Sequence, residues 1–279
     1  MDIKAADVKA LREKTGAGMM ECKKALQACN GDAHEAEKYL KEKGLAAVEK
    51  RADRATSEGI IVIKHDAKKA AMVELTCETD FVAKNADFIA VGEDIANTAF
   101  TNELTEVTPE LNDKILDLAT RVRENMTLSR VTLVKAAADE YISTYVHFDK
   151  KSGVIAVLKA DKPEIFSNED VQTFAHDCCL HAVAFPSLYI KPEDVDQTYI
   201  DEQLEIFNGQ VAELDKPEKV KTGIVQGKLK KHLAEICFLE QPFVKDDKVS
   251  VAKKMEEIGK QAGAKLSLSK LIIYHLGVK

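Results

Sequence analysis

The sequence predicts an α+β protein, because three different patterns follow one another along the chain. Short helical stretches with apolar residues three or four apart come first. Paired strand-like runs with turns between them occupy the middle, and one such unit is repeated. A helical stretch with four-three apolar spacing then interrupts the second unit. We expect a three-helix N-terminal bundle, a duplicated α+β core with antiparallel sheets, and an inserted antiparallel coiled-coil hairpin.

The first unit is expected to hold its three helices in the first 44 residues. Apolar residues at helical spacing mark the first helix over residues 7–15 and the second over residues 20–29. The third helix is expected to end at Gly44. The loop between the first two helices exposes Met19 and Met20, which either fill a gap in the bundle or contact a partner.

The core begins after a charged, alanine-rich linker. Residues 59–76 contain two strand-like runs around a turn and predict a β-hairpin. Helices are expected over residues 87–100 and 109–125. Asp80 and Phe81 follow the hairpin directly, where the chain must turn. Asp80 either caps this turn while Phe81 packs against Phe88 or Ile89, or Phe81 points at something outside the protein.

The hairpin and the helix after it are repeated later in the chain. Residues 144–158 overlay on residues 61–75 without a gap, so that Asp149 falls on Asp66 and Leu158 on Leu75. The second hairpin is followed by a helix over residues 168–184. A later helix over residues 249–261 and a strand over residues 271–277 are expected to complete the second half.

Between these parts lies the predicted coiled coil. Its first helix carries a four-three apolar seam at Ile200, Leu204, Phe207, Val211 and Leu214. We divide the chain into a docking bundle with linker (1–55), a first core half (56–140), the start of a second half (141–190), the coiled-coil insertion (191–229) and the rest of the second half (230–279).

Composition limits the classes of function. The net charge of −7 argues against non-specific nucleic-acid binding, which requires a cationic surface. The chain has no apolar run near the ~20 residues of a membrane span, and its N-terminus lacks a signal peptide. We therefore expect a cytoplasmic protein that binds neither membrane nor nucleic acid, with its six cysteines reduced.

Motifs for catalysis and metal binding are missing from the sequence. The loop TGAGMMECKK lacks the spacing of a phosphate-binding loop and favours a helix–helix turn. The stretch HDCCLH at residues 176–181 does not bring four ligands together on a helix, so core packing of its thiols is favoured over a zinc site. We expect no catalytic residues, no metal and no cofactor.

Two motifs together resemble the bacterial elongation factor Ts family, whose members exchange nucleotide on elongation factor Tu. These are TGAGMMECKKAL and, at the right distance, TDFVAKN. The resemblance extends along the chain through YVH, IKPEDV and QPFV in that order. It implies an N-terminal bundle similar to ubiquitin-associated domains, and a partner that is bound both with GDP and without nucleotide.

The resemblance also implies roles for individual residues. Thr79, Asp80, Phe81 and Val82 correspond to the tip that disturbs the Mg²⁺ and phosphate site of elongation factor Tu. His147 corresponds to a contact with the third domain of that partner. Arg12, Met19 and Met20 match the family's N-terminal docking region.

Three features depart from the family. The turn after His147 reads FDKKSG instead of a glycine-rich sequence, and Arg123 and Ser129 replace a Gly and an Arg of the segment GENIxxRRV. The chain also ends at Lys279, directly after its last expected strand, where longer members add a helical module. These departures concern contacts with the partner rather than the fold.

Three other functions remain open from the sequence. The first is an adaptor that binds ubiquitin-like or other helical partners through its bundle. The second is a nucleotide-handling enzyme built around the TGAG loop, and the third is an RNA-binding translation factor. Self-association also remains open, because a seam that faces a second helix of the same chain does not decide it.

Overall fold

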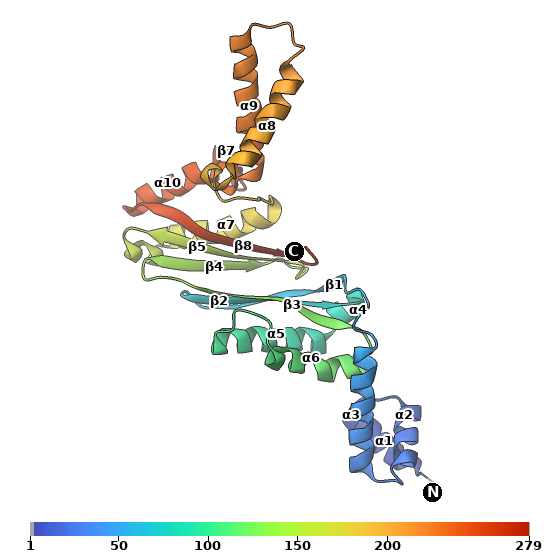
Figure 1. Ribbon diagram of the computed structural model, residues 1–279. Helices are drawn as coiled ribbons and strands as arrows, with labels where there is room; N and C mark the ends of the chain where they lie inside the picture. The colour runs from blue at the N-terminus through green and yellow to red at the C-terminus, as the bar shows by residue number, and fades with distance from the viewer. Residues whose placement is uncertain (1–2, 279) are drawn as a thin grey trace.

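Two three-stranded antiparallel sheets lie face to face at the centre of the molecule (Figure 1). We describe residues 3–278 of a computed structural model. The first sheet has the order β1-β2-β3 and consists of β1 (Glu58–His65), β2 (Lys69–Cys77) and β3 (Met126–Lys135). The second has the order β4-β5-β8 and consists of β4 (Glu140–Val146), β5 (Ser152–Ala160) and β8 (Leu266–His275). Buried apolar side chains from both sheets, among them Ile61, Met72 and Ile155, form one cluster between them.

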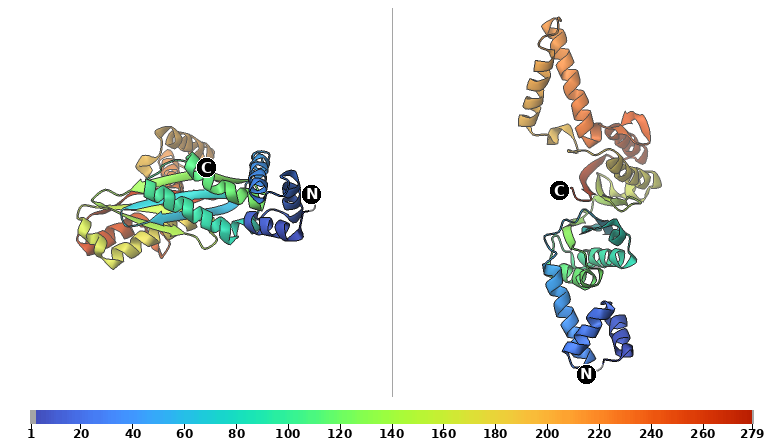
Figure 2. Two further views of the ribbon diagram at one scale, coloured as in Figure 1. Left: turned by 90° about the horizontal axis from the view of Figure 1, so that it is seen from below. Right: turned by 90° about the vertical axis from the view of Figure 1, so that its right-hand side faces the viewer.

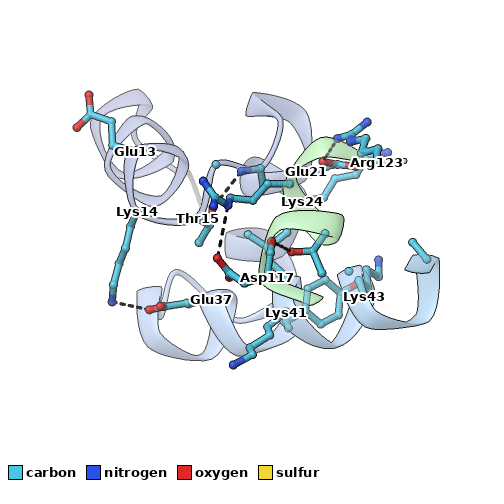
Figure 3. A pocket seen from close by; sticks show the side chains of 18 of the residues that line it. Glu13, Lys14, Thr15, Glu21, Lys24, Glu37, Lys41, Lys43, Asp117 and Arg123 are labelled. Atoms are coloured by element: carbon cyan, nitrogen blue, oxygen red, sulfur yellow. Dashed lines mark hydrogen bonds and ion pairs between the residues drawn. The ribbon is translucent and has the colours of Figure 1, made fainter. Parts of the chain in front are cut away.

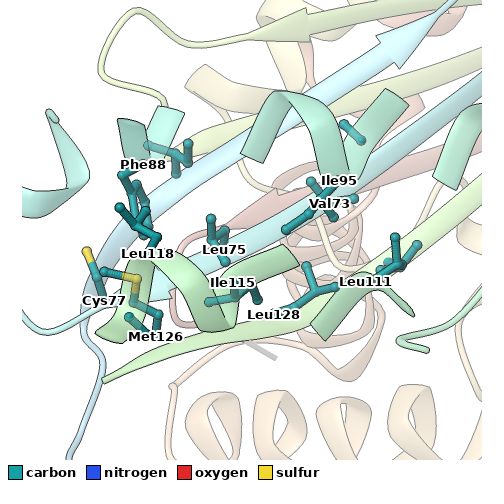
Figure 4. Packing of buried hydrophobic residues seen from close by; sticks show 14 of the residues in the cluster. Val73, Leu75, Cys77, Phe88, Ile95, Leu111, Ile115, Leu118, Met126 and Leu128 are labelled. Carbon is teal, nitrogen blue, oxygen red and sulfur yellow. The ribbon is translucent and has the colours of Figure 1, made fainter. Parts of the chain in front are cut away.

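Helices cover the outer face of each sheet, so the core has four layers (Figures 1 and 2). The first sheet is covered by α5 (Ala86–Asn102) and α6 (Pro109–Val122), and the second by α7 (Glu169–Ala184) and α10 (Val251–Ala262). Figure 4 shows the cluster under α5 and α6, where Phe88, Leu111 and Leu118 pack on Val73 and Leu75 of β2. The α+β class is confirmed.

The duplication predicted from the sequence is visible in the strand pairing. Both predicted hairpins form, β1 with β2 and β4 with β5. The register of β2 on β3 shifts between Glu74 and Leu75, and that of β5 on β8 shifts between Val157 and Leu158. These are equivalent positions in the sequence overlay. An irregularity preserved at the same place in both halves indicates that the halves share one architecture and not merely one pattern.

The structure contains a strand, β3, that the sequence did not predict. This is the main error in the prediction of the core. The helix before it was expected to reach Asn125, whereas α6 ends at Val122. Arg123 follows in the left-handed region with φ 66°, and β3 starts at Met126. The correction has a tertiary cause, because β3 forms only where β2 offers its free edge.

The N-terminal helices pack around Val8, Leu11, Cys22 and Leu26. They are α1 (Ala5–Thr15), α2 (Met19–Ala28) and α3 (Ala33–Glu49). The prediction that the third helix ends at Gly44 is wrong, because α3 continues to Glu49. At Gly44, α3 packs on α6 so closely that an added Cβ would lie 3.0 Å from the Cβ of Thr120. This glycine therefore allows a helix crossing and does not end the helix.

A helical hairpin projects from the opposite end of the core (Figures 1 and 2). It consists of α8 (Gln197–Val211) and α9 (Glu218–Ile236), so position 229 lies inside α9. In the expected seam, Val211 is buried, while Ile200, Leu204 and Phe207 are half-buried. Leu214 is 40% exposed and lies in the turn after α8, so it is not a seam residue. The coiled coil itself stays a prediction.

Short elements complete the chain. They are α4 (Asp80–Ala83), the 3₁₀ helices η1 (Pro163–Ser167), η2 (Pro192–Asp194) and η3 (Phe238–Glu240), and the two-stranded β6 (Pro242–Phe243) and β7 (Asp246–Ser250).

Candidate partner-binding site

The TDFV stretch forms a single helical turn at the end of β2. Thr79 precedes α4, and its side-chain oxygen accepts a hydrogen bond from the backbone N–H of Val82 at 3.4 Å. Thr79 is therefore the capping residue of this turn. The expectation that Asp80 caps it was wrong by one position, because Thr79 and not Asp80 has the extended backbone that a cap requires.

A second segment holds this turn in place from behind. The carboxylate of Glu124 accepts from the Thr79 hydroxyl at 2.6 Å and from the Thr79 N–H at 3.0 Å. Next to it, the Glu78 carboxylate accepts from the N–H of Asn125 at 2.6 Å, which lowers the pKa of Glu78. Two reciprocal contacts between the end of β2 and the loop before β3 thus fix the direction of α4.

The single turn directs neighbouring side chains to opposite sides. Val82 and Ala83 are buried in the cluster under α5 and α6, together with Phe88. Phe81 is 84% exposed. The alternative in which Phe81 packs against Phe88 or Ile89 is therefore wrong, because Val82 already covers that part of the core.

The charge beside the ring is fixed and negative. The carboxylate of Asp80 accepts from the ammonium group of Lys84 at 2.7 Å, and this bond is the main reason why the pKa of Asp80 lies below its ordinary value. Lys84 is one turn further along and mostly exposed. At neutral pH the tip thus presents a carboxylate, its partner ammonium and a bare aromatic ring.

The turn of the second hairpin lies beside the first strand of the first sheet. Its Lys150 carbonyl accepts from the N–H of Ile61 at 2.7 Å, and Lys151 pairs with Glu58 at 2.7 Å. His147 is half-buried at the start of this turn, and its Nδ1 lies 3.0 Å from the hydroxyl of Tyr145. The next residue, Phe148, is 87% exposed.

The predicted N-terminal docking residues all reach solvent. Arg12 is exposed in the last turn of α1, and Met19 and Met20 open α2 with 43% and 64% of their surface exposed. Gly16, with φ +68°, makes the turn between them. The exposure of both methionines argues against the alternative in which they fill the bundle core.

Where the bundle meets the core, charged side chains line a cleft of about 930 Å³ (Figure 3). Glu21 of α2 forms an ion pair with Arg123, the residue directly after α6. Arg51 is buried at this junction and donates to the carbonyl of Ala119 at 3.2 Å. Polar contacts thus join the bundle to the core beside the packing of α3 on α6 at Gly44. Arg123, a departure from the family segment, takes part in the polar contacts.

The HDCCLH stretch lies on α7, with Cys178, Cys179 and His181 buried in the core and His176 exposed. Burial raises the pKa of Cys179 to about 12. His181 is fully buried, with Nε2 2.9 Å from the side-chain oxygen of Gln241 and Nδ1 accepting from the N–H of Val244. Within residues 3–278, no three His, Cys, Asp or Glu side chains gather in a way that could hold a metal ion.

Sequence reasoning missed Glu124, Lys84 and Phe148. The ion pair of Lys84 with Asp80 could have been predicted, because the two residues are four positions apart, the spacing of an ion pair on a helix. Phe148 carries a weak signal, because it is an aromatic residue in an otherwise polar turn. Glu124 carries none, because its contact with Thr79 spans 45 residues and depends on the pairing of β2 with β3.

Hydrogen-bonded turns that expose bare aromatic rings are features of a protein that acts through contacts with another macromolecule. Among the described residues, no helix combines the length and the apolar character of a membrane span.

Comparison with known proteins gives the family. The family model for elongation factor TS matches residues 78–278. The chain is 76% identical over 278 residues to elongation factor Ts of Treponema denticola, with 100% of this chain and 99% of the relative covered. It is 58% identical to that of Treponema pallidum over 290 residues, with both chains fully covered. For that of Borrelia recurrentis the identity is 40% over 272 residues, with 97% and 96% covered.

The chain therefore belongs to the elongation factor Ts family, as its motifs predicted. It is a translation elongation factor and takes part in protein biosynthesis.

Proposed function

We propose that this chain binds elongation factor Tu in its GDP-bound and nucleotide-free forms and promotes release of GDP, so that GTP can bind. The observation that carries the proposal is the exposure of Phe81 on a turn fixed by Thr79 and Glu124. An aromatic ring that its own fold leaves exposed to solvent can be buried in an apolar slot of a partner protein.

The tip acts by disturbing the metal and phosphate site of the partner. Mg²⁺ requires near-octahedral coordination, so a small displacement of its surroundings weakens its hold on the phosphates. Phe81 enters an apolar slot of elongation factor Tu, and Asp80 brings a negative charge next to the metal site. No group on this chain has to transfer a proton or form a bond, so the chain acts as an exchange factor rather than as an enzyme.

The energy of one ring does not account for exchange. Burying a phenylalanine contributes about 2 kcal/mol. A ten-thousand-fold faster release requires about 5.5 kcal/mol of differential stabilisation. Further contacts must supply the rest. The proposed ones are the exposed Arg12, Met19 and Met20 of the bundle, together with the half-buried His147 of the second hairpin. Because coupling is reciprocal, nucleotide rebinding weakens the grip on the partner by the same amount.

The division into five parts follows from this proposal. Residues 1–55 dock on the nucleotide-binding domain of elongation factor Tu, residues 56–140 carry the tip, and residues 141–190 with 230–279 contact the third domain. The insertion at 191–229 stays outside these contacts and is the candidate for self-association. The complex acts in the cytoplasm, where elongation takes place.

The test is release of fluorescently labelled GDP from elongation factor Tu, followed by stopped flow with and without this chain. We expect acceleration by the wild-type protein and a loss of ~10-fold to 100-fold with Phe81→Ala, at unchanged circular dichroism and melting temperature. Ile206→Ala is the matched control, because it removes a side chain that is also exposed, by 50%, on α8 of the insertion, outside the proposed surface. Exchange by Phe81→Ala at the wild-type rate, or loss of its fold, contradicts the proposal.

A further inference from the structure

Phe148 is the most exposed large apolar side chain among the described residues, at 87%, and Phe81 follows at 84%. Both are aromatic, and both lie a few residues after the end of a strand: Phe148 is two residues beyond Val146 of β4, and Phe81 is four residues beyond Cys77 of β2. Neither belongs to a buried cluster of the core. Because the ring of Phe148 is hardly buried, it contributes little to the stability of the fold. Its exposure therefore points to a contact with another molecule.

The backbone under Phe148 is held firmly. The N–H of His147 donates to the carbonyl of Ser152 at 2.9 Å, and that of Lys150 donates to the carbonyl of His147 at 2.8 Å. The Asp149 carboxylate accepts from the N–H of Lys151 at 2.9 Å. Asp66 makes the same bond to Lys68 in the first hairpin, so this turn is a duplicated and ordered structure.

The ring has an aromatic support on one side. The centroids of Phe148 and His147 are 4.5 Å apart, and the row continues from His147 to Tyr145 at 5.9 Å and from Tyr145 to His176 of α7 at 5.7 Å. The His147–Tyr145 hydrogen bond fixes the second member of the row. A ring with only two side-chain torsions on such a support loses little entropy when a partner covers it.

The turn belongs to the same edge of the core as the tip. Ile61 and Glu58 of β1 contact Lys150 and Lys151 of the turn. Glu58 pairs across the sheet with Cys77, the last residue of β2, which lies four residues before Phe81, so the turn lies beside the strand end that carries the tip. A partner that receives Phe81 therefore also meets the second hairpin.

We propose that Phe148 is a second apolar anchor for elongation factor Tu, seated in an apolar slot apart from the one that receives Phe81. This inference rests on the proposed function. The two rings differ in their neighbours: Phe81 follows a carboxylate fixed by Lys84, whereas Phe148 follows a histidine that supports it. The carboxylate beside Phe148, that of Asp149, is used within its own turn, where it accepts from the N–H of Lys151, so Phe148 acts as an apolar contact that holds the partner equally in each nucleotide state.

The two roles predict different kinetics. A contact that is equally strong in all states changes affinity without changing the rate at saturation, whereas a contact made only on opening changes that rate. We expect Phe148→Ala to raise the Kd for nucleotide-free elongation factor Tu about 10-fold or more and to leave GDP release at saturating factor unchanged. Phe81→Ala is expected to lower the saturating rate.

The experiment measures both quantities by interferometry and stopped flow for Phe148→Ala, Phe148→Leu and the control Ile206→Ala, whose side chain is exposed on the insertion. Phe148→Leu keeps most of the apolar surface and is expected to retain most of the affinity. Wild-type affinity of Phe148→Ala overturns the anchor, and so does a fall in its saturating rate like that of Phe81→Ala. If the wild-type chain neither binds elongation factor Tu nor accelerates exchange, the proposed function itself is contradicted. That outcome differs from one in which the wild-type chain is active and only the role of Phe148 is contradicted.

Discussion

Phe81 and Val82 are adjacent, similar in hydrophobicity and opposite in environment. Val82 is 8% exposed and Phe81 is 84% exposed. Hydrophobicity alone assigns the larger ring to the core, and a capping pattern supports that assignment. One helical turn, anchored through Thr79 to Glu124, reverses it. At the scale of the residue, position on an anchored turn outweighs side-chain chemistry.

His181 provides a pH prediction at the same scale. Burial lowers its pKa below the ordinary value of 6.5. Its Nδ1 accepts a backbone N–H, so the folded chain holds it neutral. As pH falls below about 6.5, the unfolded chain takes up a proton that the folded chain does not, and the free energy of unfolding decreases until the folded pKa is reached. We expect lower stability at pH 5.5 than at pH 7.5 in denaturant titrations.

A matched pair of variants isolates this residue. His181→Gln removes the titrating group, so the fall between these two pH values should become smaller, whatever the absolute stability of the variant. His65→Gln removes an exposed histidine and should leave the fall unchanged. An equal pH dependence in wild type and His181→Gln contradicts the assignment.

At the scale of elements, the two hairpins are brought together by a glycine. Gly153 begins the buried part of β5, and an added Cβ would lie 2.6 Å from Cγ2 of Ile61 and 3.2 Å from the Met72 sulfur. Both neighbours are fully buried. The second sheet therefore approaches the first through a residue without a side chain.

Gly153→Ala is expected to destabilise the protein by about 1–3 kcal/mol, because Ile61 has no free space into which to move. Chemical denaturation measures this loss. Gly227→Ala in α9 is the control, since nothing lies within 4 Å of its added Cβ. That variant should be roughly 0.5–1 kcal/mol more stable if the hairpin unfolds with the core, because alanine favours a helix over glycine. A neutral Gly153→Ala contradicts the close packing of the sheets.

At the scale of the whole molecule, an ion pair between the buried carboxylate of Glu74 and the half-buried Arg130 joins the two core halves. Glu74 of β2 is 2% exposed and accepts from Arg130 of β3 and from the N–H of Gly277 after β8. Arg130 also donates to the carbonyl of His275 at 3.1 Å and lies 3.9 Å from the ring centroid of Tyr274. The charged groups of Glu74 and Arg130 in the first sheet thus form hydrogen bonds with backbone groups at the end of β8 in the second sheet.

Arg130→Met should destabilise the protein by about 3–5 kcal/mol, because it leaves the Glu74 carboxylate buried without a counter-charge. The double variant with Glu74→Gln should recover much of this loss, because no uncompensated carboxylate then stays buried. Lys9→Met breaks an exposed pair with Glu13 and is expected to cost less than about 1 kcal/mol. Equal losses in Arg130→Met and Lys9→Met contradict the buried network. Denaturant unfolding measures all three variants.

Local patterns predicted much of this fold. Both hairpins, the covering helices and the duplication follow from alternation, helical spacing and turn residues, which are properties of neighbours in sequence. Strand β3 and the full length of α3 did not follow from them. Each depends on a partner far along the chain, β2 for the strand and Thr120 for Gly44.

The candidate site divides in the same way. By itself the sequence determined the family and the residues of the TDFV motif, because specific motifs in a set order leave little freedom. Only the tertiary structure decided that Phe81 faces water, that Phe148 stands on the same edge and that Thr79 rather than Asp80 begins the turn. The physical reason is that exposure and direction are set by contacts such as Thr79 with Glu124, which bring together residues 45 positions apart.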